Sequence, residues 1–136
     1  KCIRGYPMPK IRLPFTEIYP AGGIYSRGVR SDNMLFISGT TALRSSAQGD
    51  TPMNQLRVIL DRIVRMVAAQ GGNPSDIVKL TTYVTNKSDW WPLDKEHIAI
   101  YKEYFNDEFP TNSLIEVKGL VEEGLDIEID AIAILN

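Results

Sequence analysis

The stretch DIEIDAIAIL, residues 126–135, alternates between two kinds of side chain along its length. This two-residue period predicts a β-strand, because successive side chains of a strand point to opposite faces of its sheet. One face is apolar throughout and is formed by Ile127, Ile129, Ala131, Ala133 and Leu135. The other face changes from acidic to apolar, in the order Asp126, Glu128, Asp130, Ile132 and Ile134. Such a strand is expected to run from a wet cleft into a dry contact.

A hairpin and two single strands complete the predicted sheet. The hairpin joins residues 24–29 to residues 34–37 through a polar turn. A third strand is predicted over residues 77–85, and a fourth over residues 113–117 is followed by a turn over residues 122–124. One face of the third strand is expected to carry Val78, Leu80, Thr82 and Val84.

Two helices are predicted between these strands. Thr51 and Pro52 suit the N-cap and first position of the first helix, and a pair of glycines at residues 71–72 ends it. Its apolar stripe is Leu56, Ile59, Leu60, Ile63 and Val67. Pro92 suits the first turn of the second helix. The apolar stripe of this helix is Ile98, Tyr101 and Phe105.

The resulting element order is ββαβαββ. It predicts one α/β domain with a mixed sheet over residues 22–136, behind an N-terminal extension over residues 1–21. Two helices cover only one face of the sheet, yet the strands are apolar on more than one face. Further copies of the same chain would seal the uncovered face most simply, so we expect a symmetric oligomer with clefts between its subunits.

The length and composition of the chain argue against several classes of protein. A chain of 136 residues has room for one core, and a formal net charge of -2 offers no basic field for nucleic acid. No apolar run approaches the roughly 20 residues of a membrane helix, and the N-terminal stretch has no apolar signal segment, so we expect no membrane partner and a cytoplasmic location. The lone cysteine, Cys2, and the lone histidine, His97, predict neither a disulfide nor a metal site.

Several segments between about residue 22 and residue 135 carry a family resemblance. They are GIYS (23–26), LFISG (35–39), DIVK (76–79) and IEIDAIA (127–133), together with YKEYF (101–105) and the following Phe109-Pro110. In this order and spacing they resemble the YjgF/Rid family, whose best-known members deaminate enamines and imines. The resemblance implies a chorismate-mutase-like fold, a homotrimer and three clefts at the subunit boundaries.

One position departs from that family. Its deaminating members carry an arginine in a pattern resembling Pro-x-Arg-Ser, which holds the substrate carboxylate, whereas residues 110–113 are PTNS with Asn112 in that place. An amide lacks about 1.5–3 kcal/mol of charge-assisted bonding. Three alternatives remain open: another arginine (Arg27, Arg30 or Arg44) supplies the clamp, the substrate has no carboxylate there, or the pocket binds a ligand without reacting.

Glu128 is the candidate catalytic residue. By the resemblance it holds or activates the water that attacks the C=N carbon, and its neighbours Asp126 and Asp130 could raise its pKa by like-charge repulsion. A solvated or subunit-paired carboxylate is the alternative. The candidate substrate-binding residues are Tyr25, Arg27, Ser38, Gly39, Tyr101 and Asn112. Of these, Ser38 and Gly39 would offer backbone amides to a ligand oxygen. For each of the six, ordinary packing or turn formation is also an explanation.

Three further residues have no assigned role. Trp90 and Trp91, ahead of Pro92, would line a pocket or pack at a subunit contact, and we favour packing. His97 could share a helix face with Tyr101, although a surface or partly buried position is the more ordinary expectation for a histidine.

Together these features predict a cofactor-independent hydrolase that deaminates a small imine, enamine or related unsaturated amine, similar to the aminomuconate-deaminase branch of the family. The alternative is a non-catalytic trimer that binds a metabolite or a protein. A chorismate-type isomerase would need several cations around its substrate, and the sequence shows no such cluster.

Overall fold

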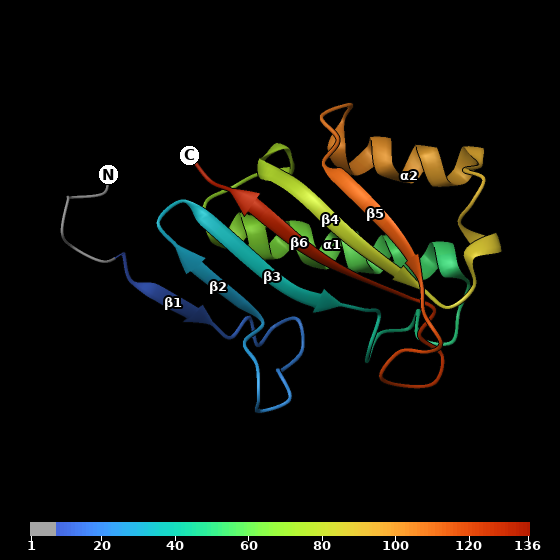
Figure 1. The fold of residues 1–136 in the computed structure, drawn as a ribbon, viewed down its shortest axis with the longest axis horizontal. Helices are drawn as coiled ribbons and strands as arrows, with labels where there is room; N and C mark the ends of the chain where they lie inside the picture. The colour runs from blue at the N-terminus through green and yellow to red at the C-terminus, as the bar shows by residue number, and fades with distance from the viewer. Residues whose placement is uncertain (1–7) are drawn as a thin grey trace.

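In the computed structural model, which describes residues 8–136, two helices lie on one face of a six-stranded sheet (Figure 1). In order across the sheet the strands are β1 (Lys10–Leu13), β2 (Gly28–Ser31), β3 (Met34–Thr40), β6 (Ile127–Ile134), β4 (Ile77–Val84) and β5 (Thr111–Glu116). Only β4 and β5 are parallel neighbours. The helices are α1 (Pro52–Ala69) and α2 (Lys95–Phe105). The predicted mixed sheet with two helices on one face is therefore confirmed.

The strand β1 is an addition to the predicted order ββαβαββ. It lies within the segment expected to be an N-terminal extension, and it pairs with β2 from Lys10 opposite Ser31 to Leu13 opposite Gly28. Its four residues, KIRL, alternate polar and apolar side chains, so the sequence carried a short strand signal there that the predicted extension did not include. Cys2 lies outside the described residues.

The first hairpin is shorter at its start and longer at its end than predicted. Residues 24–27 form a loop, in which Ile24 is 94% exposed, and β2 begins only at Gly28. The strand β3 continues to Thr40 through a β-bulge, because Ile37 pairs with Ala131 while Thr40 pairs with Ile129. The two residues between them, Ser38 and Gly39, thus face a single residue of β6.

A second irregularity corrects one predicted strand face. On β4, Ile77 pairs with Ala133 and Lys79 with Ile132, so the ladder shifts at Val78. As a result Ile77 is buried and Val78 is exposed, contrary to the predicted alternation. The rest of that face, Leu80, Thr82 and Val84, is buried as predicted.

The start of α1 is confirmed, and that of α2 is corrected. The Thr51 side chain accepts a hydrogen bond from the Asn54 amide, and Pro52 is the first residue of α1. Three residues after Pro92, α2 begins with Asp94 as its N-cap, since the Asp94 carboxylate accepts from the His97 amide at 2.8 Å. The buried residues of α2 are His97, Ile100 and Phe105, whereas Ile98 is exposed.

The central strand β6 has the two faces that its sequence predicts. Its apolar face packs under α1 in the main core, whose members include Leu56, Ile59, Leu60, Ile63, Ile127 and Ile129. We call the opposite side of the sheet the open face. Its apolar end carries exposed or half-buried Met34, Phe36, Ile132 and Ile134, and its polar end carries Tyr83, Glu128 and Asp130. Among residues 8–136, neither helix combines the length and apolar character needed to cross a bilayer.

Truncation of a core side chain on α1 should be costly. Ile63 is fully buried, so Ile63→Ala should lower the free energy of unfolding by about 2–5 kcal/mol through lost burial and a residual cavity. Urea denaturation at fixed protein concentration measures this loss. As the control on the same helix, Arg65→Ala removes only an exposed ion pair with Asp61 and should change stability by less than about 0.5 kcal/mol; equal losses for the two variants would contradict the packing described.

Candidate active site

The predicted site residues lie on two different faces of the sheet. Directly paired residues of neighbouring strands project to the same face. Glu128 pairs with Tyr83 and projects from the open face, whereas Asn112 pairs with the fully buried Leu80 and projects toward α2. The chain therefore carries two separate groups of candidate residues, which we call half-sites, each with its own cavity.

The first half-site, here called the acidic cleft, is a cavity of about 410 Å³ on the open face. It is lined by Glu128, Asp130, Tyr83, Val117, Leu120 and Val121. The Tyr83 hydroxyl donates to Asp130 at 3.3 Å, which leaves Glu128 as the carboxylate of the cleft without a tyrosine donor. Among the described residues, no three His, Cys, Asp or Glu side chains lie together as metal ligands would.

The β-bulge makes room for the Glu128 carboxylate. A Cβ added at Gly39 would lie 2.7 Å from Glu128 Cδ and would overlap Oε2. Only glycine allows the backbone to approach the carboxylate so closely. Gly39 therefore fixes where the carboxylate sits, a role that differs from the backbone donor expected of it.

The surroundings of Glu128 shift its pKa upward and so favour its protonated form relative to that of an exposed carboxylate. Burial raises the pKa of Glu128, the nearby Arg27 charge opposes this, and the Asp130 charge adds to the rise. The expected effect of Asp130 is thus confirmed. Asp126, by contrast, accepts a hydrogen bond from Gln55 Nε2 at 2.8 Å and is not among the groups that shift Glu128.

Arg27 lies behind the bulge and not at the cleft surface. Its side chain is fully buried, Nη2 donates to the Gly39 carbonyl at 2.7 Å, and Tyr19 and Tyr25 stack on the guanidinium at 4.6 and 5.4 Å. Its Nε and Nη1 atoms have no hydrogen-bond partner among residues 8–136. Of the two rings over the guanidinium, Tyr25 is half-exposed and Tyr19 is buried.

The remaining candidates near the bulge have structural partners. The Ser38 hydroxyl donates to the Ser26 carbonyl at 2.6 Å and the Ser38 amide to the Arg27 carbonyl at 3.0 Å, so the Ser38 amide is not free for a ligand oxygen as expected. Arg30 donates to the Gln70 carbonyl at the end of α1. These bonds tie residues 26–30 to the core and do not offer a second carboxylate clamp.

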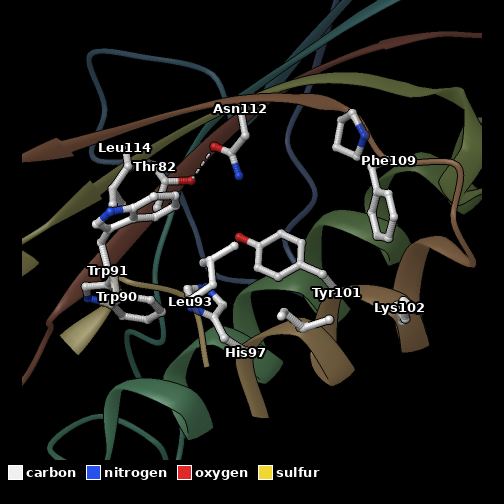
Figure 2. A pocket seen from close by; sticks show the side chains of 12 residues that line it. Thr82, Trp90, Trp91, Leu93, His97, Tyr101, Lys102, Phe109, Asn112 and Leu114 are labelled. Atoms are coloured by element: carbon white, nitrogen blue, oxygen red, sulfur yellow. Dashed lines mark hydrogen bonds between the residues drawn. The ribbon is translucent and has the colours of Figure 1, made fainter. Parts of the chain in front are cut away.

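The second half-site, here called the aromatic pocket, is a cavity of about 440 Å³ between β5, β4 and α2 (Figure 2). Its lining residues include Thr82, Trp90, Trp91, His97, Tyr101 and Asn112. The Thr82 hydroxyl donates to Asn112 Oδ1 at 2.9 Å, which turns the amide nitrogen of Asn112 into the cavity (Figure 2). The Tyr101 hydroxyl points toward the same space, and burial raises the pKa of Tyr101.

Four rings line this pocket from α2 and the loop before it, namely Trp90, Trp91, His97 and Tyr101. His97 contacts Trp90 edge-on at 5.3 Å and Tyr101 at 5.4 Å, and Tyr101 stacks on Phe105 at 6.0 Å. Burial lowers the pKa of His97, so the ring is neutral at pH 7. The i, i+4 spacing of His97 and Tyr101 was one sequence signal for this wall. Lining a pocket was also one of the two alternatives for Trp90 and Trp91, although packing was favoured. Nothing in the local sequence marked Thr82 as a pocket residue, because it occupies a strand face.

Comparison with known proteins agrees with the fold and with the motifs. The family model for endoribonuclease L-PSP matches residues 16–135. The chain belongs to the YjgF/Rid family. A 2-iminobutanoate/2-iminopropanoate deaminase of Escherichia coli is 35% identical to it over 123 residues, which cover 88% of this chain and 94% of that protein. A RutC family protein of Pyrococcus horikoshii is 32% identical over 124 residues, with the same coverage of both chains.

Solved structures of YjgF/Rid proteins share this fold. The Rv2704 protein of Mycobacterium tuberculosis, a YjgF/YER057c/UK114 member, has a TM-score of 0.76 at 28% identity and covers 93% of this chain and 100% of its own. The Rid protein YyfA of Yersinia pestis has a TM-score of 0.80 at 26% identity with the same coverage. The predicted family and its fold are therefore confirmed.

The close approach of Gly39 and Glu128 gives a test of this geometry. Gly39→Ala should lower the free energy of unfolding by about 1–3 kcal/mol, because the new methyl group displaces the carboxylate. In a Glu128→Ala background the same change should lose most of that cost, since the overlapping atoms are gone. Urea denaturation of the four proteins at one concentration measures the coupling, and a fully additive result would contradict the contact.

Proposed function

We propose that this YjgF/Rid protein is a cofactor-independent deaminase of small imines and enamines that works in clefts between the subunits of a homotrimer. The observation that carries the proposal is the Glu128 carboxylate, which is half-buried against the Gly39 bulge and whose pKa is raised. The relative from Escherichia coli, named as a 2-iminobutanoate/2-iminopropanoate deaminase, supports the reaction class. We extend the proposal to conjugated amines, such as the substrates of the aminomuconate-deaminase branch, because a flat skeleton suits the aromatic pocket.

The proposed reaction needs one group that takes and returns a proton. Glu128 accepts a proton from water as the water oxygen bonds to the C=N carbon, and the C=N electron pair moves to nitrogen. The protonated Glu128 then donates to that nitrogen. Glu128 then takes the hydroxyl proton and passes it to the nitrogen as the C–N bond breaks, so ammonia leaves and the hydroxyl oxygen becomes a carbonyl. An enamine first accepts a proton on carbon from protonated Glu128, which gives the iminium ion and returns Glu128 to the carboxylate that accepts a proton from water.

The two half-sites are proposed to meet across a subunit boundary. The acidic cleft and the aromatic pocket lie on opposite faces of one sheet, so a single subunit cannot present both to one substrate. Exposed apolar groups border each of them: Ile24 and Tyr25 project beside the bulge, and Trp91 and Leu93 form the rim of the pocket. Contact between these groups of neighbouring subunits would bury apolar surface and close the cleft.

A non-catalytic role is the second candidate, and Asn112 is the observation that favours it. Without the family's arginine, the pocket could hold a ligand that never reaches Glu128 in a reactive pose. The description of the matching family, endoribonuclease L-PSP, suggests an RNA substrate, whose phosphates would require a surface of basic residues. The formal net charge of -2 and the carboxylates of the acidic cleft do not favour RNA binding.

Replacement of Glu128 should separate catalysis from folding. Glu128→Gln should reduce ammonia release from 2-iminopropanoate or a conjugated enamine by roughly 100- to 10,000-fold, because an amide cannot exchange the proton. Its free energy of unfolding at pH 7 should be equal or higher. A raised folded-state pKa means that ionisation of Glu128 disfavours the fold as the pH rises through that pKa. Unchanged turnover in Glu128→Gln would favour the non-catalytic role or another catalytic group.

The neighbouring acid provides a matched pH experiment. Turnover should fall as the pH drops through the raised pKa of Glu128, because only the carboxylate accepts a proton from water. Asp130→Asn removes a charge that raises this pKa, so the acid limb of the kcat/KM profile should move to lower pH with activity retained. A limb that stays in place or moves to higher pH would speak against Glu128 as the titrating base.

Disruption of the open face should dissociate the oligomer. Phe36 is 40% exposed in the subunit, and Phe36→Glu would bury a charge in the proposed contact, so the variant should sediment as a monomer and lose turnover. Ile11→Glu is the control, because Ile11 is similarly exposed but lies on β1 away from this face. The wild-type chain should sediment as a trimer at micromolar concentration; a stable monomer would exclude the proposed clefts.

A further inference from the structure

We infer that the aromatic pocket binds a flat, unsaturated ligand group whose polar end is an uncharged hydrogen-bond acceptor, such as a carbonyl or an amide. In the proposed deaminase, this ligand group would be the part of the substrate that lies away from the C=N bond, so its role in catalysis rests on that proposed function. The binding itself does not depend on turnover. A preference for an uncharged group would make the pocket discriminate against the substrate carboxylate that the arginine of other family members binds.

The walls of the pocket favour a flat group. A cavity of about 440 Å³ holds a small molecule, and its walls include the indoles of Trp90 and Trp91 and the rings of His97 and Tyr101 (Figure 2). Trp90 is 1% exposed and is held edge-on by His97, so this part of the wall is rigid. Conjugated groups stack on such rings better than saturated chains of similar size do.

The polar end of the pocket offers neutral donors. Thr82 occupies the Asn112 oxygen, so the Asn112 amide nitrogen presents its hydrogens to the cavity (Figure 2). The Tyr101 hydroxyl is directed to the same region (Figure 2). A carbonyl oxygen placed there would accept from Asn112 while its carbon skeleton lay between the rings.

The pocket does not compensate a buried negative charge. Among its lining residues the one permanent cation is Lys102, which lies at the exposed rim with Nζ 3.9 Å from Asp107 Oδ1. The buried His97 is neutral at pH 7, because burial lowers its pKa. A carboxylate would lose its hydration here and gain only neutral hydrogen bonds, whereas an uncharged acceptor has much less hydration to lose.

Tryptophan fluorescence provides a direct readout of this pocket, because both tryptophans of the chain line it. We would titrate the full-length protein with benzamide, with benzoate, and with cyclohexanecarboxamide, which keeps the amide but is not flat. Benzamide should change the emission saturably, with a Kd at least about tenfold lower than those of the other two probes. Equal or tighter binding of benzoate or of cyclohexanecarboxamide, or no saturable binding of any probe, would overturn the inference.

Two substitutions at one position test the polar end. Asn112→Arg should reverse the preference, so that benzoate binds at least about tenfold more tightly than benzamide. The matched control is Asn54→Arg, the same change at an exposed site on α1, which should leave the wild-type ratio intact. If Asn112→Arg does not fold, Asn112→Leu should weaken benzamide by about five- to tenfold through loss of the donor. A ratio unchanged in Asn112→Arg, or an affinity for benzamide unchanged in Asn112→Leu, would overturn the inference.

Turnover and probe binding, measured on the same wild-type protein, separate this inference from the proposed reaction. If the wild-type protein hydrolyses no imine but prefers benzamide over the other two probes, and Asn112→Arg reverses the preference between benzamide and benzoate, the deaminase proposal fails and the pocket assignment stands. If the wild-type protein hydrolyses imines but binds benzoate as tightly as benzamide, only the pocket assignment fails.

Discussion

The structure depends on the alternating side chains of β6, the strand at the centre of the sheet. Each apolar residue of its inner face is covered by α1, which forces the residues between them onto the open face. Glu128 and Asp130 are there because Ile127, Ile129 and Ala131 must be buried. A shift of one residue would place two carboxylates in the core and expose the isoleucines, so the folding energy of the sheet also fixes the position of the chemistry.

The second constraint is local and concerns space. A carboxylate on a flat strand would extend into solvent, but the extra residue of the β3 bulge and the missing side chain of Gly39 let it settle against the backbone. Arg27 holds the far side of this arrangement through the Gly39 carbonyl. The buried guanidinium limits the rise in the pKa of Glu128 that burial and Asp130 produce. The functional state of one acid is thus a balance of desolvation against a nearby charge.

Much of the fold could be predicted because its signals are local and periodic. The faces of β6, the stripe of α1 and the Thr51-Pro52 start follow from spacing alone, and they are confirmed. The errors arose where pairing across the sheet overrides the local pattern, as at the Val78 bulge, where a strand signal spans only four residues, as in β1, or where a nearby cap competes, as Asp94 does with Pro92. For the candidate site, Glu128, Tyr101 and Asn112 each line a cavity, but their division between two faces depends on strand register, which no single segment encodes.

The position of the two half-sites bears on how a newly made chain behaves. Each subunit carries the acid on one side of its sheet and the aromatic pocket on the other, with the hydrogen-bonded backbone between them. In the proposed oligomer, a single subunit is therefore catalytically inactive, and activity arises only when subunits associate. A mixed oligomer of two variants, one altered in the acidic cleft and the other in the aromatic pocket, could also regain one intact active site. This site would form at the subunit boundary where the unaltered acidic cleft of one chain meets the unaltered aromatic pocket of the other.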